Sequence, residues 1–239
     1  ANSESTTTPE AFDIVDYVEV EIGGQCIDKH YGEWMEVWAD LTDANKGGLN
    51  RMLHSAGVND KGKVYVPFMF WFCRNPGLAL PLIALQYHEV KFNVKLGKCS
   101  TDGSHCDMSV WCDYVFLDTD ERRRFAQVSH EYLIEQVQRS NPQSVGGCNH
   151  EAKLLFNHPV KELVWLVRGG CGDGSCSGDK WSDGAGAGVH SGDSHRCDSA
   201  LLQLNGHDRF RERAGDYFTD VQRYQHHTGD RNIAVAGAP

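Results

Sequence analysis

The amino-acid sequence predicts an all-β protein, a sandwich or barrel built from short strands. Residues 18–22 alternate apolar and acidic side chains and are followed by Gly23-Gly24, a pattern typical of a half-buried strand that ends in a turn. Residues 89–96 alternate again, with Val90, Phe92, Val94 and Leu96 on one face. Helical patterns are sparse. Short strands separated by turn residues favour a sandwich or barrel over a helical fold.

Four further apolar runs extend the strand pattern. Residues 64–72 are apolar along their length, which predicts a strand covered on both faces, and Pro67 restricts that strand to an edge or a bulge. A turn is expected at Arg74–Gly77. The remaining predicted strands are residues 109–117, 163–167 and 200–204.

Two short helices are expected between the strands. Residues 30–41 carry Trp34, Met35 and Trp38 at helix-like spacing. Asp118 and the acidic residues after it form a helix-capping pattern that leads into residues 122–126. Both segments are short enough to connect strands without changing the fold class.

Composition and charge narrow the classes of function. The 239 residues carry a formal net charge of −10, which argues against direct nucleic-acid binding. No apolar run is long enough to span a membrane. With nine cysteines, an odd number, and no secretory signal, free buried thiols are expected. Both ends of the sequence are interpreted as cuts within a longer protein, so that open sheet edges would make the piece alone prone to aggregation.

Residues 169–198 differ from the rest in being rich in Gly, Ser and Asp. A segment that can bury so little between two strands predicts a long, exposed loop. Its start, residues 169–174, resembles a phosphate-binding loop but lacks the Gly-Lys-Ser/Thr ending, and it misses the calcium β-roll pattern by one position.

The sequence also contains an internal echo. Residues 17–24 and 199–206 each alternate apolar residues before a turn, Gly23-Gly24 in one and Asn205-Gly206 in the other. An aromatic residue follows each turn at a similar distance, at Trp34 and Tyr217. The echo predicts two copies of one domain, with each segment forming the same strand in its own copy.

Long stretches of the sequence resemble the major capsid proteins of nucleocytoplasmic large DNA viruses, closest to their phycodnavirus and mimivirus-like branch. The stretches that carry the resemblance are residues 20–34, 75–91 and 116–138, followed in the same order by 157–165, 204–210 and 224–229. They cover most of the chain outside residues 169–198.

The resemblance implies a tandem double jelly roll, two eight-stranded β-sandwich barrels. Residues 1–124 would form the latter part of the first barrel and residues 125–239 the early part of the second. In this family three chains form a pseudo-hexagonal capsomer, and capsomers tile an icosahedral shell over an internal membrane. The implied partners are two further copies of the chain, neighbouring capsomers, and minor capsid and penton proteins. The implied location is the virion, assembled in the host cytoplasm. The family supplies no catalytic, cofactor-binding or metal-binding residue, so none is expected here and the protein is not expected to be an enzyme.

The principal alternative is a jelly-roll carbohydrate-binding or cupin-like module. A cupin metal site needs a His-x-His pair with further inward ligands. His88-Glu89 stands alone in its strand, where His88 is expected to be a hydrogen-bonded residue near the core. His226 and His227 are adjacent, so in an extended strand they would point to opposite faces. Size in solution separates the two functions. A capsid protein is expected to form trimers once the full chain is present, whereas such a module would be stable as a monomer.

Two other groups of residues could carry chemistry. The candidate zinc ligands are Cys148, Cys171, Cys176, Cys197, His190 and His195. Their spacing does not match the paired ligands of structural zinc sites, which favours free thiols. The basic run Arg122–Arg124 is offset by neighbouring acidic residues, which favours a solvated, salt-bridged turn, with contact to a neighbouring capsid chain as the alternative.

Overall fold

The structure is a computed structural model that describes residues 11–42, 52, 64–97, 107–144, 149–166, 197 and 199–228. The chain divides into two compact units. The first comprises residues 1–40 and 45–156, and the second comprises residues 41–44 and 157–239. No helix in the described ranges is long and apolar enough to cross a membrane.

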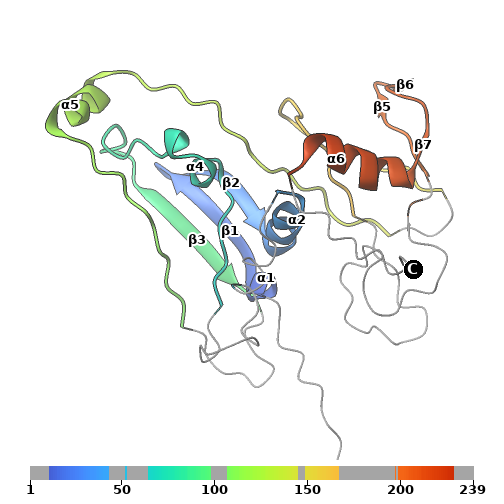
Figure 1. Ribbon diagram of the computed structural model, residues 1–239, viewed down its shortest axis with the longest axis horizontal. Helices are drawn as coiled ribbons and strands as arrows, with labels where there is room; N and C mark the ends of the chain where they lie inside the picture. The colour runs from blue at the N-terminus through green and yellow to red at the C-terminus, as the bar shows by residue number, and fades with distance from the viewer. Residues whose placement is uncertain are drawn as a thin grey trace, which may run out of the picture. The chain divides into compact units, whose positions relative to one another are not determined.

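The first unit is built on a three-stranded antiparallel sheet with the order β2-β1-β3 (Figure 1). A short helix α1 (Ala11–Ile14) leads into β1 (Val15–Ile22), which pairs with β2 (Gln25–Tyr31) and with β3 (Val90–Leu96). Gly23 and Gly24 form the two-residue turn between β1 and β2, with φ values of 60° and 84°. Left-handed residues at both turn positions match the twist of a hairpin, which explains the two glycines.

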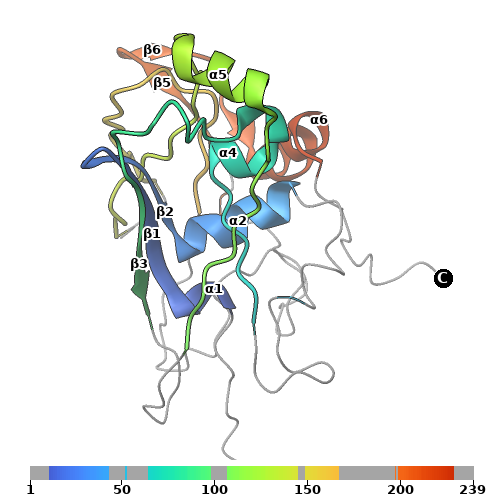
Figure 2. The same ribbon diagram turned by 90° about the vertical axis from the view of Figure 1, so that its left-hand side faces the viewer.

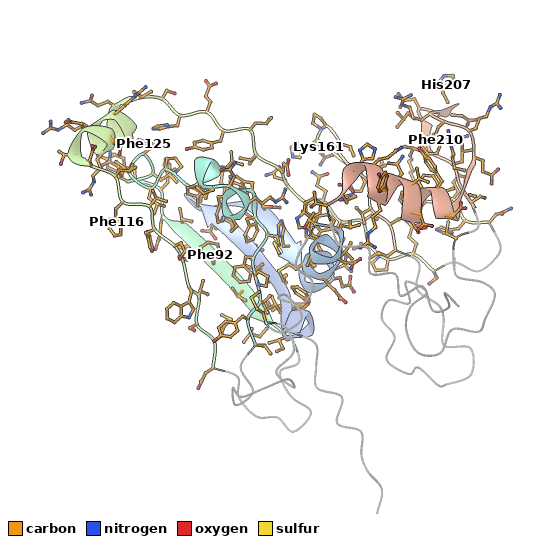
Figure 3. The ribbon with its side chains drawn as sticks, viewed as in Figure 1. Phe92, Phe116, Phe125, Lys161, His207 and Phe210 are labelled. Atoms are coloured by element: carbon orange, nitrogen blue, oxygen red, sulfur yellow. The ribbon has the colours of Figure 1, made fainter. Side chains whose placement is uncertain are left out.

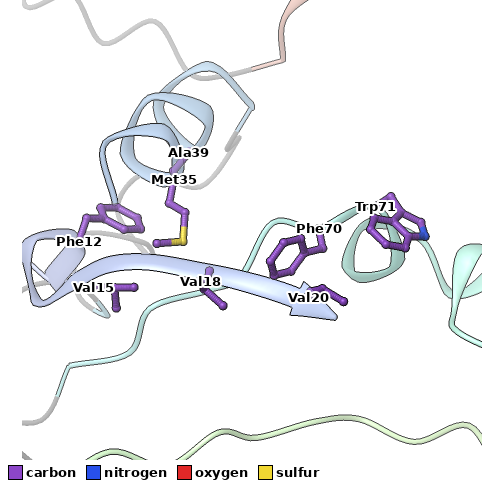
Figure 4. Close-up of a cluster of buried hydrophobic side chains, with 8 residues drawn as sticks. All are labelled: Phe12, Val15, Val18, Val20, Met35, Ala39, Phe70 and Trp71. Atoms are coloured by element: carbon purple, nitrogen blue, oxygen red, sulfur yellow. The ribbon is translucent and has the colours of Figure 1, made fainter. Parts of the chain in front are cut away.

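Helices α2 (Gly32–Thr42) and α4 (Trp71–Arg74) lie on one face of this sheet, seen nearly edge-on in Figure 2. The buried core between them is small and apolar (Figure 4), and consists of Phe12, Val15, Val18, Val20, Met35, Ala39, Phe70 and Trp71. Gly32, the first residue of α2, packs closely against the backbone of α1. A Cβ at this position would lie 2.3 Å from the carbonyl oxygen of Phe12, so only glycine fits there. The expected helix at 30–41 is thus confirmed, with its start shifted to Gly32 because Tyr31 still belongs to β2.

Two local predictions are confirmed in the rest of the first unit. Asn75 accepts a hydrogen bond from the backbone N–H of Gly77 at 2.8 Å and caps the short 3₁₀ helix η1 (Pro76–Leu78). Helix α5 (Thr119–Gln127) starts at a capping box, in which Asp118 accepts from the Glu121 N–H at 2.8 Å and Glu121 accepts from the Asp118 N–H.

Three predicted strands are absent as strands. Residues 64–70, 109–117 and 163–166 form no ladder in the described parts of the chain, and Trp71 begins a helix instead of ending a strand. The first of these runs nevertheless supplies Phe70 to the core. Strand propensity mainly reflects fit to a neighbouring strand and a covered face, so an apolar run without a partner stays extended without becoming a strand.

In its described residues, the second unit contains two ladders of two residues each. Strand β4 (Ser199–Ala200) pairs with β7 (Arg213–Ala214), and β5 (Gln203–Leu204) pairs with β6 (His207–Asp208). The π-helical turn η2 (Tyr217–Gln222) and α6 (Arg223–His226) follow. The single strand predicted at 200–204 is therefore interrupted at residues 201–202, where the Leu202 carbonyl accepts from the Arg209 N–H.

In the described part of the second unit, three aromatic rings lie around Phe218. Its ring lies 5.1 Å from Trp165, 5.9 Å from Phe210 and 5.3 Å from Tyr217 between centroids.

The internal echo is confirmed in its local geometry. Asn205 and Gly206 have φ values of 53° and 80°, and they join β5 to β6 just as the two glycines join β1 to β2. The two hairpins lie in separate sheets, and a helical segment follows each: α2 in the first unit, η2 and α6 in the second. Burial differs between the copies, because Val18 and Val20 are fully buried whereas Leu204 is 54% exposed.

Candidate assembly surface

Exposed apolar side chains concentrate on segments that form no ladder. Trp111 is 89% exposed and Phe116 is 94% exposed, on the extended segment that leads to α5 (Figure 3). The same segment exposes Met108, Val110, Tyr114 and Val115. Monomeric soluble proteins rarely display such contiguous apolar surface, so residues 107–118 are candidates for a covered interface in the assembled protein. We call residues 107–118 the apolar segment.

The face of the first sheet that points away from the buried core is charged and solvated. Lys29 on β2 lies 3.3 Å from the Glu19 carboxylate on β1, and its ammonium lies 3.6 Å from the centre of the Tyr17 ring. On β3, hydrogen bonding to Glu89 raises the pKa of Lys91, and hydrogen bonding to Asp16 raises the pKa of Lys95. Charged side chains on strands oppose edge-to-edge and face-to-face association, so this face is a poor site for a partner.

A polar pair is buried on the core side of β2. Asp28 and His30 are 4% and 1% exposed, and His30 Nε2 lies 2.9 Å from Asp28 Oδ2, without the alignment of a hydrogen bond. The other carboxylate oxygen, Oδ1, accepts hydrogen bonds from the backbone N–H groups of Lys29 at 2.9 Å and Val137 at 3.0 Å. The His30 ring stacks on Phe70 at 4.3 Å between centroids. A buried carboxylate is costly unless it is paired and hydrogen-bonded, as this one is.

Residues 134–139, which we call the strap, run past β2 and α2. Ile134 packs against the apolar core. Glu135 pairs with Arg74, whose guanidinium lies 4.6 Å from the centre of the Trp38 ring. At the other end, Arg139 pairs with Glu33 at 2.9 Å and lies 4.6 Å from the centre of the Tyr31 ring. Each end of the strap is thus fixed by an arginine that contacts both a carboxylate and an aromatic face.

The histidines named from the sequence do not come together. His88 is exposed in a bend before β3, so the expectation of a histidine near the core is wrong. It lies outside the strand because β3 begins only at Val90. His226 ends α6, and His227 just beyond it lies 2.6 Å from the Glu162 carboxylate.

The cysteines and arginines have separate outcomes. Cys26, Cys73 and Cys112 are free, as expected, but exposed rather than buried, because the strands that were to cover them are not formed or leave their side chains outside. Burial around the sulfur still raises the pKa of the Cys73 thiol. Arg123 lies 3.5 Å from Asp120, so the expected salt bridge is present, but within helix α5 rather than in a turn.

The zinc hypothesis falls mostly outside the described residues. Of its six side chains, only Cys197 is described. Among the residues that the structure describes, no group of three potential ligands is close enough to hold a metal ion. The loop predicted at 169–198 also lies outside the described residues, apart from Cys197.

Sequence reasoning missed the buried pair and the strap. One signal was present, because Asp28 and His30 are two residues apart in a strand and so share a face, and that face is the inward one. The hydrogen-bond partner of Asp28, Val137, is 109 positions away in the sequence, and no local pattern connects the two residues.

Comparisons with known proteins match both halves of the chain. The family described as "Major capsid protein N-terminus" matches residues 2–118, and the family described as "Large eukaryotic DNA virus major capsid protein" matches residues 121–232.

Individual relatives agree with these matches. The chain is 47% identical over 230 residues to a major capsid protein of Pyramimonas orientalis virus, covering 90% of this chain and 53% of the relative. It is 40% identical to that of Paramecium bursaria Chlorella virus 1, covering 92% of this chain and 59% of the relative. It is 34% identical to that of Phaeocystis pouchetii virus, covering 90% of this chain and 66% of the relative. The chain thus spans between about half and two thirds of the length of these relatives.

Solved structures give the fold. A crystal structure of PBCV-1 VP54, fitted into a reconstruction of the virophage Sputnik, matches with a TM-score of 0.68 and 34% identity, over 92% of this chain and 62% of the other. A quasi-atomic model of the PBCV-1 virus capsid matches with a TM-score of 0.65 and 36% identity over the same shares.

These likenesses show the tandem double jelly-roll fold that the family resemblance implied, and they disfavour the cupin-like alternative. With both halves matched in order and relatives at up to 47% identity, the chain belongs to the major capsid protein family of large eukaryotic DNA viruses.

Proposed function

We propose that this protein is a shell-building subunit, of which three copies form a pseudo-hexagonal capsomer in an icosahedral viral capsid. The observation that carries the proposal is the 47% identity to a major capsid protein over 90% of this chain. The exposed aromatic residues of the apolar segment support it, because a subunit that works by packing needs apolar surface to bury.

In this proposal the protein's work is mechanical, and it is not an enzyme. It needs no catalytic residue, cofactor or metal. Its partners are two further copies, neighbouring capsomers, and minor capsid and penton proteins, with no direct nucleic-acid contact. It is located in the virion, next to an internal membrane, after assembly in the host cytoplasm. The net charge of −10 is consistent with a subunit that does not contact the genome.

We also propose that residues 1–124 and 125–239 belong to the first and second jelly rolls. The two family matches support this division, since one ends at residue 118 and the other begins at residue 121. Helix α5 (Thr119–Gln127) then spans the crossing from one barrel to the next.

The test is the mass of the full natural chain in solution, measured by light scattering at micromolar concentration. The expected result is three times the mass of one chain, and electron microscopy should show pseudo-hexagonal particles. Trp111→Asp should lower the trimer fraction, because it places a charge on the apolar segment, while Asp113→Asn on the same segment serves as the control. A folded protein that remains monomeric throughout would contradict the proposal.

A further inference from the structure

The strap and the buried carboxylate of Asp28 are joined by contacts within the first unit. The strap belongs to the region matched by the second capsid family, at residues 121–232, yet it binds β2 and α2, which belong to the region matched by the first. The contacts therefore join parts of the chain that are distant in sequence and distinct in family assignment.

The strap is held by directed polar contacts, although it forms no strand ladder. Asp28 Oδ1 accepts from the Val137 N–H at 3.0 Å, and the Gln136 side chain donates to the Ile27 carbonyl. Because Asp28 is 4% exposed, its bond to Val137 is shielded from competing water. The two arginine clamps, Arg74 with Glu135 and Arg139 with Glu33, lie nearer the surface.

The position of Asp28 makes it the centre of this arrangement. His30 Nε2 lies 2.9 Å from the second carboxylate oxygen, Oδ2, and the His30 ring stacks on Phe70 in the core. A buried polar group of this kind specifies alignment more than it adds stability, as polar residues do at buried positions of coiled coils. Here a slip of one residue would bring the carboxylate of Glu135 toward the apolar position of Ile134.

We propose that the register of the strap, residues 134–139, on the first unit is set by Asp28. Asp28 acts as a positioning residue through the hydrogen bond that its Oδ1 accepts from the Val137 N–H. The surface clamps at Arg74 and Arg139 then close the strap on either side. When the strap is seated, it fixes where the chain leaves the first sheet. The core cluster is built mainly from β1, α2 and the residues around Phe70, so β1 should keep its contacts when the strap is loosened.

The first arm of the test is hydrogen exchange of the full natural chain, read on peptides that cover the strap and on peptides that cover β1. Asp28→Ala removes the acceptor and should speed exchange in the strap by about tenfold or more, with β1 unchanged within about twofold. Asp28→Asn keeps an oxygen for the Val137 N–H and should stay within about threefold of the natural protein. Asp16→Ala, which removes an exposed carboxylate 2.6 Å from Lys95, is the control and should leave the strap unchanged.

The second arm avoids any risk that a core substitution prevents folding. A double variant, Glu33→Gln with Glu135→Gln, weakens both clamps at half-exposed positions. Trypsin should then cut after Arg139 several times faster than in the natural protein, with cutting elsewhere unchanged. Unchanged cutting after Arg139 would overturn the proposal. So would Asp28→Ala exchange that is unchanged in the strap, or raised equally in β1, since Asp28 would then be an ordinary core residue.

Discussion

The two hairpins of this protein have turns of the same conformation but differ in strand length and in burial. Gly23 and Gly24 have φ values of 60° and 84°, and Asn205 and Gly206 have 53° and 80°. The first hairpin continues into eight- and seven-residue strands whose central inward residues, Val18, Val20 and His30, are buried. The second continues into strands of two residues each, with exposed side chains. Turn conformation is thus set locally by residues that tolerate positive φ, whereas strand length depends on a partner layer.

The largest difference between the two hairpins should come from the apolar residues in each hairpin and in the layer that packs on it. Met35→Ala opens a cavity beneath α2, where Met35 is fully buried, and should cost about 2–5 kcal/mol of unfolding free energy. Leu204→Ala, at a side chain that is 54% exposed, should change it by less than about 0.5 kcal/mol. Urea unfolding of the full natural chain measures both. Equal losses would mean that the second hairpin is covered in solution as well as the first.

A smaller effect should come from the turns themselves. Ala at position 206 meets no atom within 4 Å, so Gly206→Ala should cost only the left-handed strain, about 1–2 kcal/mol. Gly23→Ala adds a clash, because the new Cβ would lie 2.5 Å from His88 Nδ1. The additional His88→Ala substitution should return Gly23→Ala to the cost of Gly206→Ala. Thermal unfolding of the three variants tests this, and a double variant no better than Gly23→Ala would disprove the clash.

The capping box of α5 tests local encoding without any core contribution, since α5 has no buried residue. Asp118→Ala removes the acceptor for the Glu121 N–H and should cost the helix about 0.5–2 kcal/mol. Asp118→Asn keeps a capping oxygen and should cost less. Hydrogen exchange across residues 119–127 reads the difference, and identical exchange in both variants would show that the cap does not hold the helix.

The smallest expected effect is on a thiol of the first unit. Burial raises the pKa of Cys73, so less of it is thiolate at a given pH than in the unfolded chain. Alkylation of Cys73, followed by mass spectrometry, should therefore rise with pH at higher values in the folded protein than in urea. If alkylation of the folded protein rose at the same pH as in urea, or at a lower pH, the effect of burial on the Cys73 pKa would be ruled out.

The features that the sequence predicted correctly are those with local causes. Gly23-Gly24 and Asn205-Gly206 are turns because of their own backbone preferences. Asp118 and Glu121 cap α5 through neighbours three residues apart. The alternation of apolar and polar residues in β3 matches the burial of its side chains, since Val90, Phe92 and Val94 are half-buried.

The features that could not be predicted depend on distant partners. Residues 109–117 have the composition of a strand but no strand beside them in the described ranges, so their aromatic side chains remain exposed. The site shows the same limit. The inward positions of Asp28 and His30 follow from alternation, but the contact of Asp28 with Val137 depends on how the distant segment around Val137 reaches β2.

The duplication is the central claim, and an experimental structure of the full natural chain in its assembled state tests it most directly. Residues 17–24 are superposed on residues 199–206, and the segments that follow are compared. The account predicts that β2 and the strand segments from residue 207 onward fall into register, with α2 and the η2–α6 segment in equivalent places. If the two segments instead paired within one sheet, or if either became helical, the two-barrel account would be wrong.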